Sequence, residues 1–116
     1  SKKSDHWLKI KNRRSLMGTI GGYMEEGTTV RSLALGLFQD GDLVYIGRAG
    51  SGMTEDQARE LHQQLAALHI SSCPFSALPP SKKDEVLHWV KPMVEIPVEY
   101  MELTEEGFLR HPVIKL

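Results

Sequence analysis

A single helical segment lies among short apolar runs interrupted by glycine, and this pattern limits the chain to a small β-rich fold. Residues 54–69 begin with Thr-Glu-Asp-Gln, the pattern of a capping box, and continue with apolar residues at helical spacing. We therefore predict a helix over residues 54–69. The chain has 116 residues, which is enough for one domain to bury a core.

Three strands are predicted before this helix, over residues 16–24, 29–38 and 43–47. The Asp-Gly pair at residues 40–41 supplies the positive φ that a tight hairpin needs. We therefore expect the second and third strands to pair directly and all three to form an antiparallel meander.

The composition of the first two strands predicts their curvature and their faces. The first strand contains three glycines, which suit a strand that coils around a small barrel: Gly18, Gly21 and Gly22. In the second strand leucines alternate with small residues, so we expect a half-buried strand. The small residues expected to point outward are Ser32, Ala34 and Gly36.

The chain after the helix is punctuated by prolines. Residues 70–80 predict an irregular connection because proline removes backbone donors. A short helical turn is expected next, capped by Ser81 with Asp84 and stopped by Pro92. The side chains expected to face inward from this turn are Val86, Leu87 and Trp89.

Two more strands complete the predicted fold. Alternation returns over residues 93–103, where Pro97 is expected to place part of the strand at an edge or a bulge. The last strand begins at Phe108 and is interrupted at residues 111–112. The order predicts a mainly β fold: a five-stranded Greek-key OB-fold barrel with one α-helix between strands 3 and 4.

Charge divides the chain into a basic head and an acidic body. Residues 1–14 carry six basic residues against one acidic residue, a net +5, and the remainder carries eight against fourteen, a net −6. A basic head can meet phosphate, whereas an acidic body binds nucleic acid only where its few cations gather. The other interpretation, which charge alone favours, is that the head is a solvated tail.

Several classes of site are excluded or disfavoured. Cys73 is the one cysteine, so a disulfide framework and a four-cysteine zinc site are excluded, and its neighbours give no reason for a reactive thiol. No apolar run approaches the roughly 20 residues of a membrane span, and we expect a cytoplasmic protein. The glycine-rich loop 47–52 lacks nucleotide-binding spacing, and the five histidines lack metal-ligand spacing. We therefore expect no metal site, and histidines at the surface or at an interface.

The segment 7–11, Trp-Leu-Lys-Ile-Lys, places Trp7, Lys9 and Lys11 on one face of a strand. Two neighbouring lysines can hold a phosphate, or they can be solvated on an amphipathic edge strand. Composition alone favours the solvated edge strand.

The chain resembles a known family over residues 7–116. Residues 7–11 resemble motif V of the nucleotidyltransferase domain of ATP-dependent DNA ligases, and the rest resembles their C-terminal OB domain. The matching stretches are Ile20-Gly21-Gly22-Tyr23, Ser32-Leu33-Ala34-Leu35-Gly36, Leu43-Val44-Tyr45-Ile46-Gly47 with Gly50-Ser51-Gly52-Met53, Trp89-Val90-Lys91-Pro92, and Thr104 to Pro112. The similarity is greatest to bacterial and archaeal ligases, including the ligase module of bacterial end-joining proteins.

This resemblance implies sealing of DNA nicks in three steps. A lysine attacks ATP, AMP passes to a 5′ phosphate, and a 3′ hydroxyl displaces it. The Lys-x-Asp-Gly motif of that lysine is absent here, and motif VI, Arg-x-Asp-Lys, is expected beyond Leu116. We therefore expect residues 1–14 to be the end of a nucleotidyltransferase domain and the hinge, residues 15–116 to be an OB domain truncated before motif VI, and the fragment alone to be inactive.

Roles for individual residues also follow from the resemblance. Lys9 and Lys11 are expected to bind the α-phosphate of ATP, and Asn12 lies in the expected hinge. The residues expected to contact DNA are Arg13, Arg14, Arg48, Lys91 and Arg110. The intact enzyme would use ATP with Mg²⁺ or Mn²⁺, act on nicked double-stranded DNA as a monomer, and work with its upstream nucleotidyltransferase domain in cis.

Two alternatives remain at this stage. One is a stand-alone OB-fold module that binds single strands or a protein. The other is the OB domain of an RNA ligase or mRNA capping enzyme, which the Trp-Val-Lys-Pro and Leu-Arg-His-Pro stretches disfavour.

Overall fold

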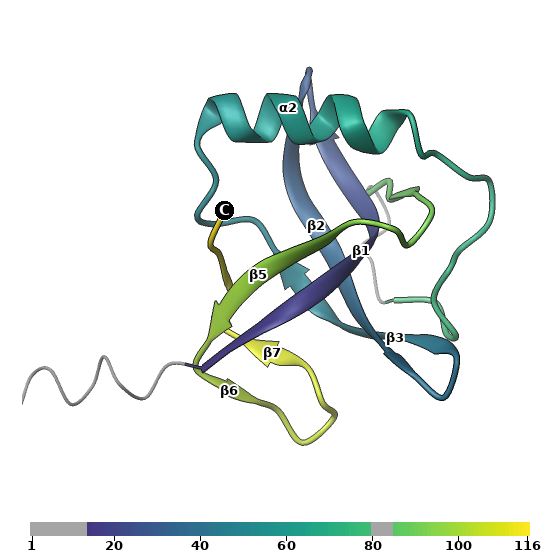
Figure 1. Cartoon of the computed structure of the whole chain (residues 1–116), viewed down its shortest axis with the longest axis vertical. Helices are drawn as coiled ribbons and strands as arrows, with labels where there is room; N and C mark the ends of the chain where they lie inside the picture. The colour runs from purple at the N-terminus through teal and green to yellow at the C-terminus, as the bar shows by residue number, and fades with distance from the viewer. Residues whose placement is uncertain (1–13, 80–84) are drawn as a thin grey trace, which may run out of the picture.

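A computed structural model of the chain describes residues 14–79 and 85–116, and shows a mainly β fold with one helix after the third strand (Figure 1). The strands and the helix are β1 (Arg14–Glu26), β2 (Thr29–Gln39), β3 (Asp42–Ala49), α2 (Glu55–Ala66), β4 (His88–Trp89), β5 (Glu95–Tyr100), β6 (Glu102–Leu103), β7 (Leu109–Arg110) and β8 (Val113–Ile114). Among these residues, no helix is both long enough and apolar enough to cross a lipid bilayer.

The strands form an antiparallel sheet in the order β3-β2-β1-β5-β8, and the short strand β4 also pairs with β1. The predicted meander of the first three strands is therefore confirmed. Its hairpin turn contains Asp40 at φ 53° and Gly41 at φ 87°, as the Asp-Gly pair predicts. β1 has a register irregularity between Ile20 and Gly22, where the glycine cluster indicated curvature.

The two ends of the sheet approach each other without a continuous strand ladder. No pairing joins β3 to β7 or β8 among the described residues. One backbone hydrogen bond crosses the gap, because Ile114 N donates to Ser51 O at 2.8 Å, two residues after β3 ends. A Cβ built on Gly47 of β3 would lie 3.4 Å from the backbone nitrogen of Leu109 in β7. The sheet is therefore strongly curved, and its two ends are in contact.

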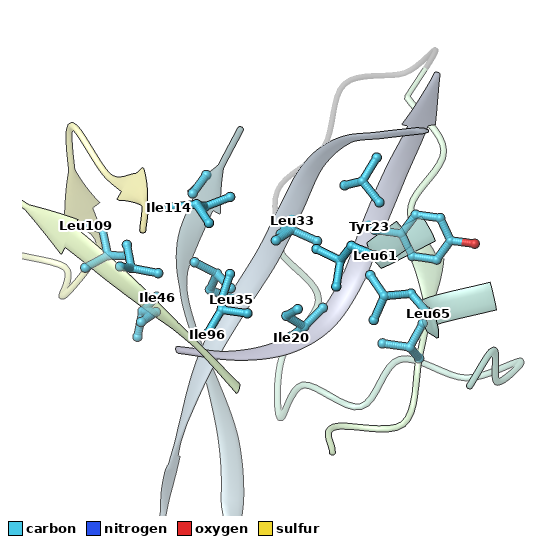
Figure 2. Packing of buried hydrophobic residues seen from close by; sticks show 14 of the residues in the cluster. Ile20, Tyr23, Leu33, Leu35, Ile46, Leu61, Leu65, Ile96, Leu109 and Ile114 are labelled. Carbon is cyan, nitrogen blue, oxygen red and sulfur yellow. The ribbon is translucent and has the colours of Figure 1, made fainter. Parts of the chain in front are cut away.

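The helix α2 forms where the sequence predicts it, although it ends three residues earlier. Thr54 is the N-cap, with its side chain accepting from Gln57 N and the Gln57 side chain accepting from Thr54 N, so the capping box is complete. Leu61 and Leu65 bury the inner face of α2 against the open end of the curved sheet. Figure 2 shows these two side chains directed into the same core as Ile20.

A second, smaller core covers the outer face of the sheet and corrects one expectation. Ala34 is fully buried, because Phe75 packs over β2 and β3 together with Leu43. Phe75 pairs with Leu43 in an isolated bridge, and the residue after it, Ser76, donates its N–H to Leu43 O at 2.8 Å. The prediction that Ala34 points outward to solvent is wrong because the irregular connection folds back over that face.

Residues 88–89 form a strand, whereas the sequence predicts a helical turn there. Val90 N donates to Gly21 O at 3.1 Å, and Ile70 N donates to Trp89 O at 2.9 Å. This segment therefore bonds to β1 and to the chain after α2 instead of forming helical bonds. The expected cap at residues 81 and 84 lies outside the described residues.

Pro97 lies where β5 has a strand on one side only, because the pairing with β8 covers just Val98 and Glu99, so the expected edge position is confirmed. It is opposite Met17 in an unbroken register with β1, and its carbonyl accepts from Lys115 N at 2.9 Å. The N–H and C=O of one residue point to the same neighbour in an antiparallel strand. The nitrogen and the carbonyl of Pro97 therefore both point toward β8. The lack of an N–H removes no hydrogen bond to β1, and the carbonyl bonds to Lys115 N. The predicted interruption at residues 111–112 is confirmed, since it separates β7 from β8.

Candidate nucleic-acid interface

Four of the cations that the resemblance assigns to DNA lie in the described part of the chain. They are Arg14, Arg48, Lys91 and Arg110. The other assigned residues, Lys9, Lys11 and Arg13, and the hinge residue Asn12, lie outside the described residues.

Arg14 and Arg110 lie on either side of the end of β5. Arg14, at the start of β1, is opposite Tyr100, and Met101 N donates to Arg110 O at 2.9 Å. Both arginines are exposed. The Nε of Arg110 lies 3.1 Å from a carboxylate oxygen of Glu102, an exposed ion pair of small energy. This part of the fold therefore presents two guanidinium groups to solvent.

Arg48 occupies a different place, half-buried on the outer face of β3. Its Nη2 lies 3.0 Å from Oε1 of Glu85, and its Nη1 donates to the sulfur of Met24 at 3.0 Å. Burial alone would lower the pKa of Arg48, but the hydrogen bonds to Glu85 and Tyr45 outweigh burial, so the pKa is raised. The pKa of Tyr45 is also raised. Here burial is the cause, and the hydrogen bond from Arg48 opposes it. Arg48 is therefore a permanently charged group held by a carboxylate.

Lys91 lies apart from both groups. It is exposed, it follows the segment that bonds to Gly21, and its N–H donates to Leu68 O at 2.9 Å. Strands β2 and β1 separate Lys91 from Arg48 in the sheet. Arg14 and Gly21 are seven residues apart along β1, which is roughly 23 Å at the rise of an extended strand. The structure places Arg14 and Arg110 on either side of the end of β5 and leaves Arg48 and Lys91 at other positions.

The structure shows a side-chain cluster that the sequence did not indicate. Glu25, at the end of β1, lies 2.8 Å from Nε2 of His62 in α2 and 3.5 Å from Nε2 of His88 in β4. The hydrogen bond from His62 holds the pKa of Glu25 below its usual value, with charge attraction from His88 adding to it and partial burial opposing. Tyr23 places its ring against both imidazoles, at centroid distances of 5.6 and 5.2 Å. The pairs are 37 and 63 residues apart in sequence, so no local spacing could have shown them.

A hollow lies between α2 and β5, and no signal in the sequence indicated it. Its volume is about 290 Å³, and Glu60 of α2 and Glu95 of β5 lie among its lining residues. Two carboxylates at one opening repel phosphate. The α2 side of the fold is therefore the less favourable side for a nucleic-acid backbone.

A metal ion or a phosphate loop would need particular groups among the described residues. The described residues contain no group of three or more His, Cys, Asp or Glu that could hold a metal ion. The loop at residues 47–52 is occupied by contacts of its own, since a Cβ on Gly50 would lie 2.7 Å from Arg31 O. The nucleotide assignment therefore depends on Lys9 and Lys11, outside the described residues.

Comparison with known proteins decides among the alternatives. Residues 26–116 match the family described as the C terminal region of ATP dependent DNA ligases. The chain belongs to this family. This match and the structural similarity to a LigD ligase domain identify the chain as the OB domain of such a ligase. The resemblance stated from the sequence is therefore confirmed.

The similar proteins are bacterial end-joining proteins. The chain is 30% identical over 97% of its length to the multifunctional non-homologous end joining protein LigD of Pseudomonas aeruginosa, and 35% identical over 90% of its length to that of Mycobacterium bovis. In each case it spans 14% of the relative, about one seventh of its length. The crystal structure of the ligase domain from M. tuberculosis LigD superposes with a TM-score of 0.81 at 33% identity, over 89% of this chain and 34% of that domain. A mycobacterial DNA ligase D complexed with ATP and MES gives a TM-score of 0.79 at 33% identity, over 88% of this chain and 33% of the other.

Proposed function

We propose that this chain is the mobile OB domain of an ATP-dependent DNA ligase of the bacterial end-joining type. It closes over the nucleotidyltransferase domain for self-adenylation and then engages duplex DNA at a nick for sealing, in the bacterial cytoplasm. One observation carries the proposal: the described fold superposes on a third of the M. tuberculosis LigD ligase domain at 33% identity.

We also propose that the curved sheet is a closed five-stranded barrel. The five strands are β1, β2, β3, β5 and the interrupted β7–β8 pair. The hydrogen bond from Ile114 N to Ser51 O, at 2.8 Å, supports closure between the end of β3 and the last strand. Closure matters for function because it fixes the outer face as a rigid surface that can be presented first to a protein domain and then to DNA.

Packing of the aromatic residues disfavours a single-strand-binding module. Such modules stack bases on exposed aromatic side chains along a basic groove. Here Phe75 is buried and packs edge-on against Tyr45 and Trp89, at centroid distances of 5.5 and 6.1 Å. Phe38 is the one aromatic side chain that is mostly exposed among the described residues, at 53%. A basic aromatic groove is therefore absent from the described surface.

The proposed contacts with DNA are to phosphate. Arg14 and Arg110 provide two exposed guanidinium groups, and Arg48, Lys91 and Arg13 complete the proposed set. Cations that bind phosphate position a protein without reading base sequence, which suits an enzyme that seals nicks in any sequence. Lys9 and Lys11 are proposed to stabilise the charge on the α-phosphate of the substrate ATP.

The first experiment tests the parent activity directly. The intact ligase that contains this chain is incubated with ATP and Mg²⁺ or Mn²⁺ and examined by intact-mass spectrometry. We expect a covalent AMP adduct that is discharged when nicked duplex is added. A folded, intact protein that forms no adduct would contradict the proposal and favour a stand-alone binding module.

Two lysine variants test the assignment of nucleotide binding. In the intact ligase, Lys9→Ala and Lys11→Ala should reduce adduct formation far more than they reduce binding to nicked duplex. Equal adduct yields in the double variant and the wild type would show that these lysines do not contact the α-phosphate. Arg31→Ala, at an exposed position of β2 outside the proposed set, is the control for loss of one positive charge.

DNA binding by the chain itself should be weak, with a shallow salt dependence. Three or four phosphate contacts give a slope of log K against log salt of about −2.7 to −3.6. Nanomolar affinity that salt leaves unchanged would contradict binding through phosphate.

A further inference from the structure

We infer that Glu85 competes with a DNA phosphate for the guanidinium of Arg48, so that this ion pair restrains DNA binding until a phosphate replaces the carboxylate. The inference depends on the proposed function, because it takes Arg48 to be a phosphate contact in the intact ligase.

The geometry gives Glu85 the position that a phosphate oxygen would take. The carboxylate lies 3.0 Å from Nη2 of Arg48, and both side chains are 22% exposed. A guanidinium binds carboxylate and phosphate in the same planar arrangement. The two anions therefore cannot occupy that side of Arg48 together.

Two further contacts of Arg48 hold it in place without competing in this way. Its Nη1 donates to the sulfur of Met24 at 3.0 Å, and a thioether is a weak acceptor. Tyr45 holds a hydrogen bond with the guanidinium and is itself packed against Phe75 and Phe108. Arg48 therefore stays oriented on β3 when Glu85 leaves, and a phosphate can form a charge-assisted hydrogen bond in its place.

Glu85 lies on a segment that can move without breaking the sheet. Residues 85–87 belong to no helix or strand, and the pairing of β4 with β1 begins at His88. Val86 beside it is 66% exposed. Withdrawal of the Glu85 side chain leaves the bonds of Val90 to Gly21 and of Lys91 to Leu68 unchanged.

The experiment compares charge-matched variants of the intact ligase for binding to nicked duplex that carries a 5′ phosphate, measured by fluorescence anisotropy without ATP or metal. Glu85→Gln should bind about two- to fivefold more tightly than the wild type, the range that an ion pair of this exposure holds. The slope of log K against log salt should steepen by about 0.9, the value for one further phosphate contact. Glu60→Gln on α2 is the matched control, because it removes the same charge far from Arg48.

Two further variants separate release of Arg48 from a general charge effect. Glu85→Asp keeps the net charge but shortens the side chain, so it should also bind more tightly than the wild type. In an Arg48→Gln background, Glu85→Gln should change affinity no more than Glu60→Gln does. Thermal melting of each variant identifies any that fail to fold. If Glu85→Gln fails to fold, the affinity of Glu85→Asp is compared with that of the wild type instead.

The inference is overturned if Glu85→Gln and Glu60→Gln bind equally, or if Glu85→Gln weakens binding, which would show that Glu85 orients Arg48 for DNA. Either result can occur while adduct formation and sealing remain intact, so this failure is distinct from failure of the proposed function. An absent adduct in the wild type would instead remove the proposed function itself.

Discussion

Phe75 packs over glycines of two neighbouring strands, and replacing one of them should destabilise the fold by a calculable amount. A Cβ added at Gly21 would lie 2.6 Å from Cζ and 2.8 Å from Cε2 of the Phe75 ring, closer than real Cβ contacts. The same ring also covers Gly36, where an added Cβ would lie 2.8 Å from Cε1, and it packs edge-on against Tyr45 and Trp89, so the ring can move only by disturbing these neighbours. Overpacking of this kind costs about 1–3 kcal/mol, and the stiffer unfolded chain returns about 0.4–1 kcal/mol. The midpoints of these two ranges give an expected net loss of about 1.3 kcal/mol for Gly21→Ala.

Gly18, in the same strand, is the matched control. A Cβ there would lie 3.5 Å from the nearest atoms of Leu35, an ordinary contact, so Gly18→Ala should be neutral or stabilising. Urea denaturation followed by tryptophan fluorescence gives the two free energies, and about 1 kcal/mol corresponds to a fall in melting temperature of about 4 °C or more. In a Phe75→Leu background, the cost of Gly21→Ala should fall by about 1 kcal/mol. Equal costs for Gly18→Ala and Gly21→Ala, or no coupling to residue 75, would refute the steric argument.

Two other expectations concern the helix and the carboxylate cluster. Thr54→Ala removes the side-chain acceptor for Gln57 N and should cost about 1 kcal/mol in urea denaturation, whereas Thr54→Ser should retain most of that stability. The hydrogen bond from His62 holds the pKa of Glu25 below its usual 4.5. The ionised carboxylate therefore stabilises the fold fully above pH 4.5. This contribution to stability is lost as the pH falls through the lowered pKa. The melting temperatures of wild type and Glu25→Gln should therefore differ above pH 4.5 and converge in more acidic solution; a constant difference would contradict the pairing.

Local signals predicted the parts of the fold that local chemistry determines. The capping box placed the start of α2, the Asp-Gly pair placed the β2–β3 hairpin, and the interruption at residues 111–112 divided the last strand. Each of these features depends on residues within four positions of one another. The order of the segments then limited the arrangement of strands to few possibilities.

Contacts between distant segments were the features that local signals could not provide. Leucines alternate with small residues in β2, so the face with the small residues was expected to be exposed to solvent. Residues 29–38 contain no signal that Phe75 covers this face. Residues 88–89 carry helical spacing, yet their backbone bonds to β1, and Gly22 admits the Trp89 ring, which would lie 2.9 Å from an added Cβ. Tertiary packing overrides weak local propensity in both cases.

The candidate DNA contact and the unpredicted packing belong to one connected region. Phe75 contacts Tyr45 edge-on, and Tyr45 holds Arg48 by a hydrogen bond. A displacement of Phe75, such as Gly21→Ala would impose, therefore reaches the guanidinium through one intervening side chain. If Arg48 contacts phosphate, Gly21→Ala should weaken DNA binding at temperatures well below its melting temperature, whereas Thr54→Ala, of similar cost in stability, should leave affinity unchanged. A parallel loss in both variants would mean that global stability, and not the orientation of Arg48, determines the affinity.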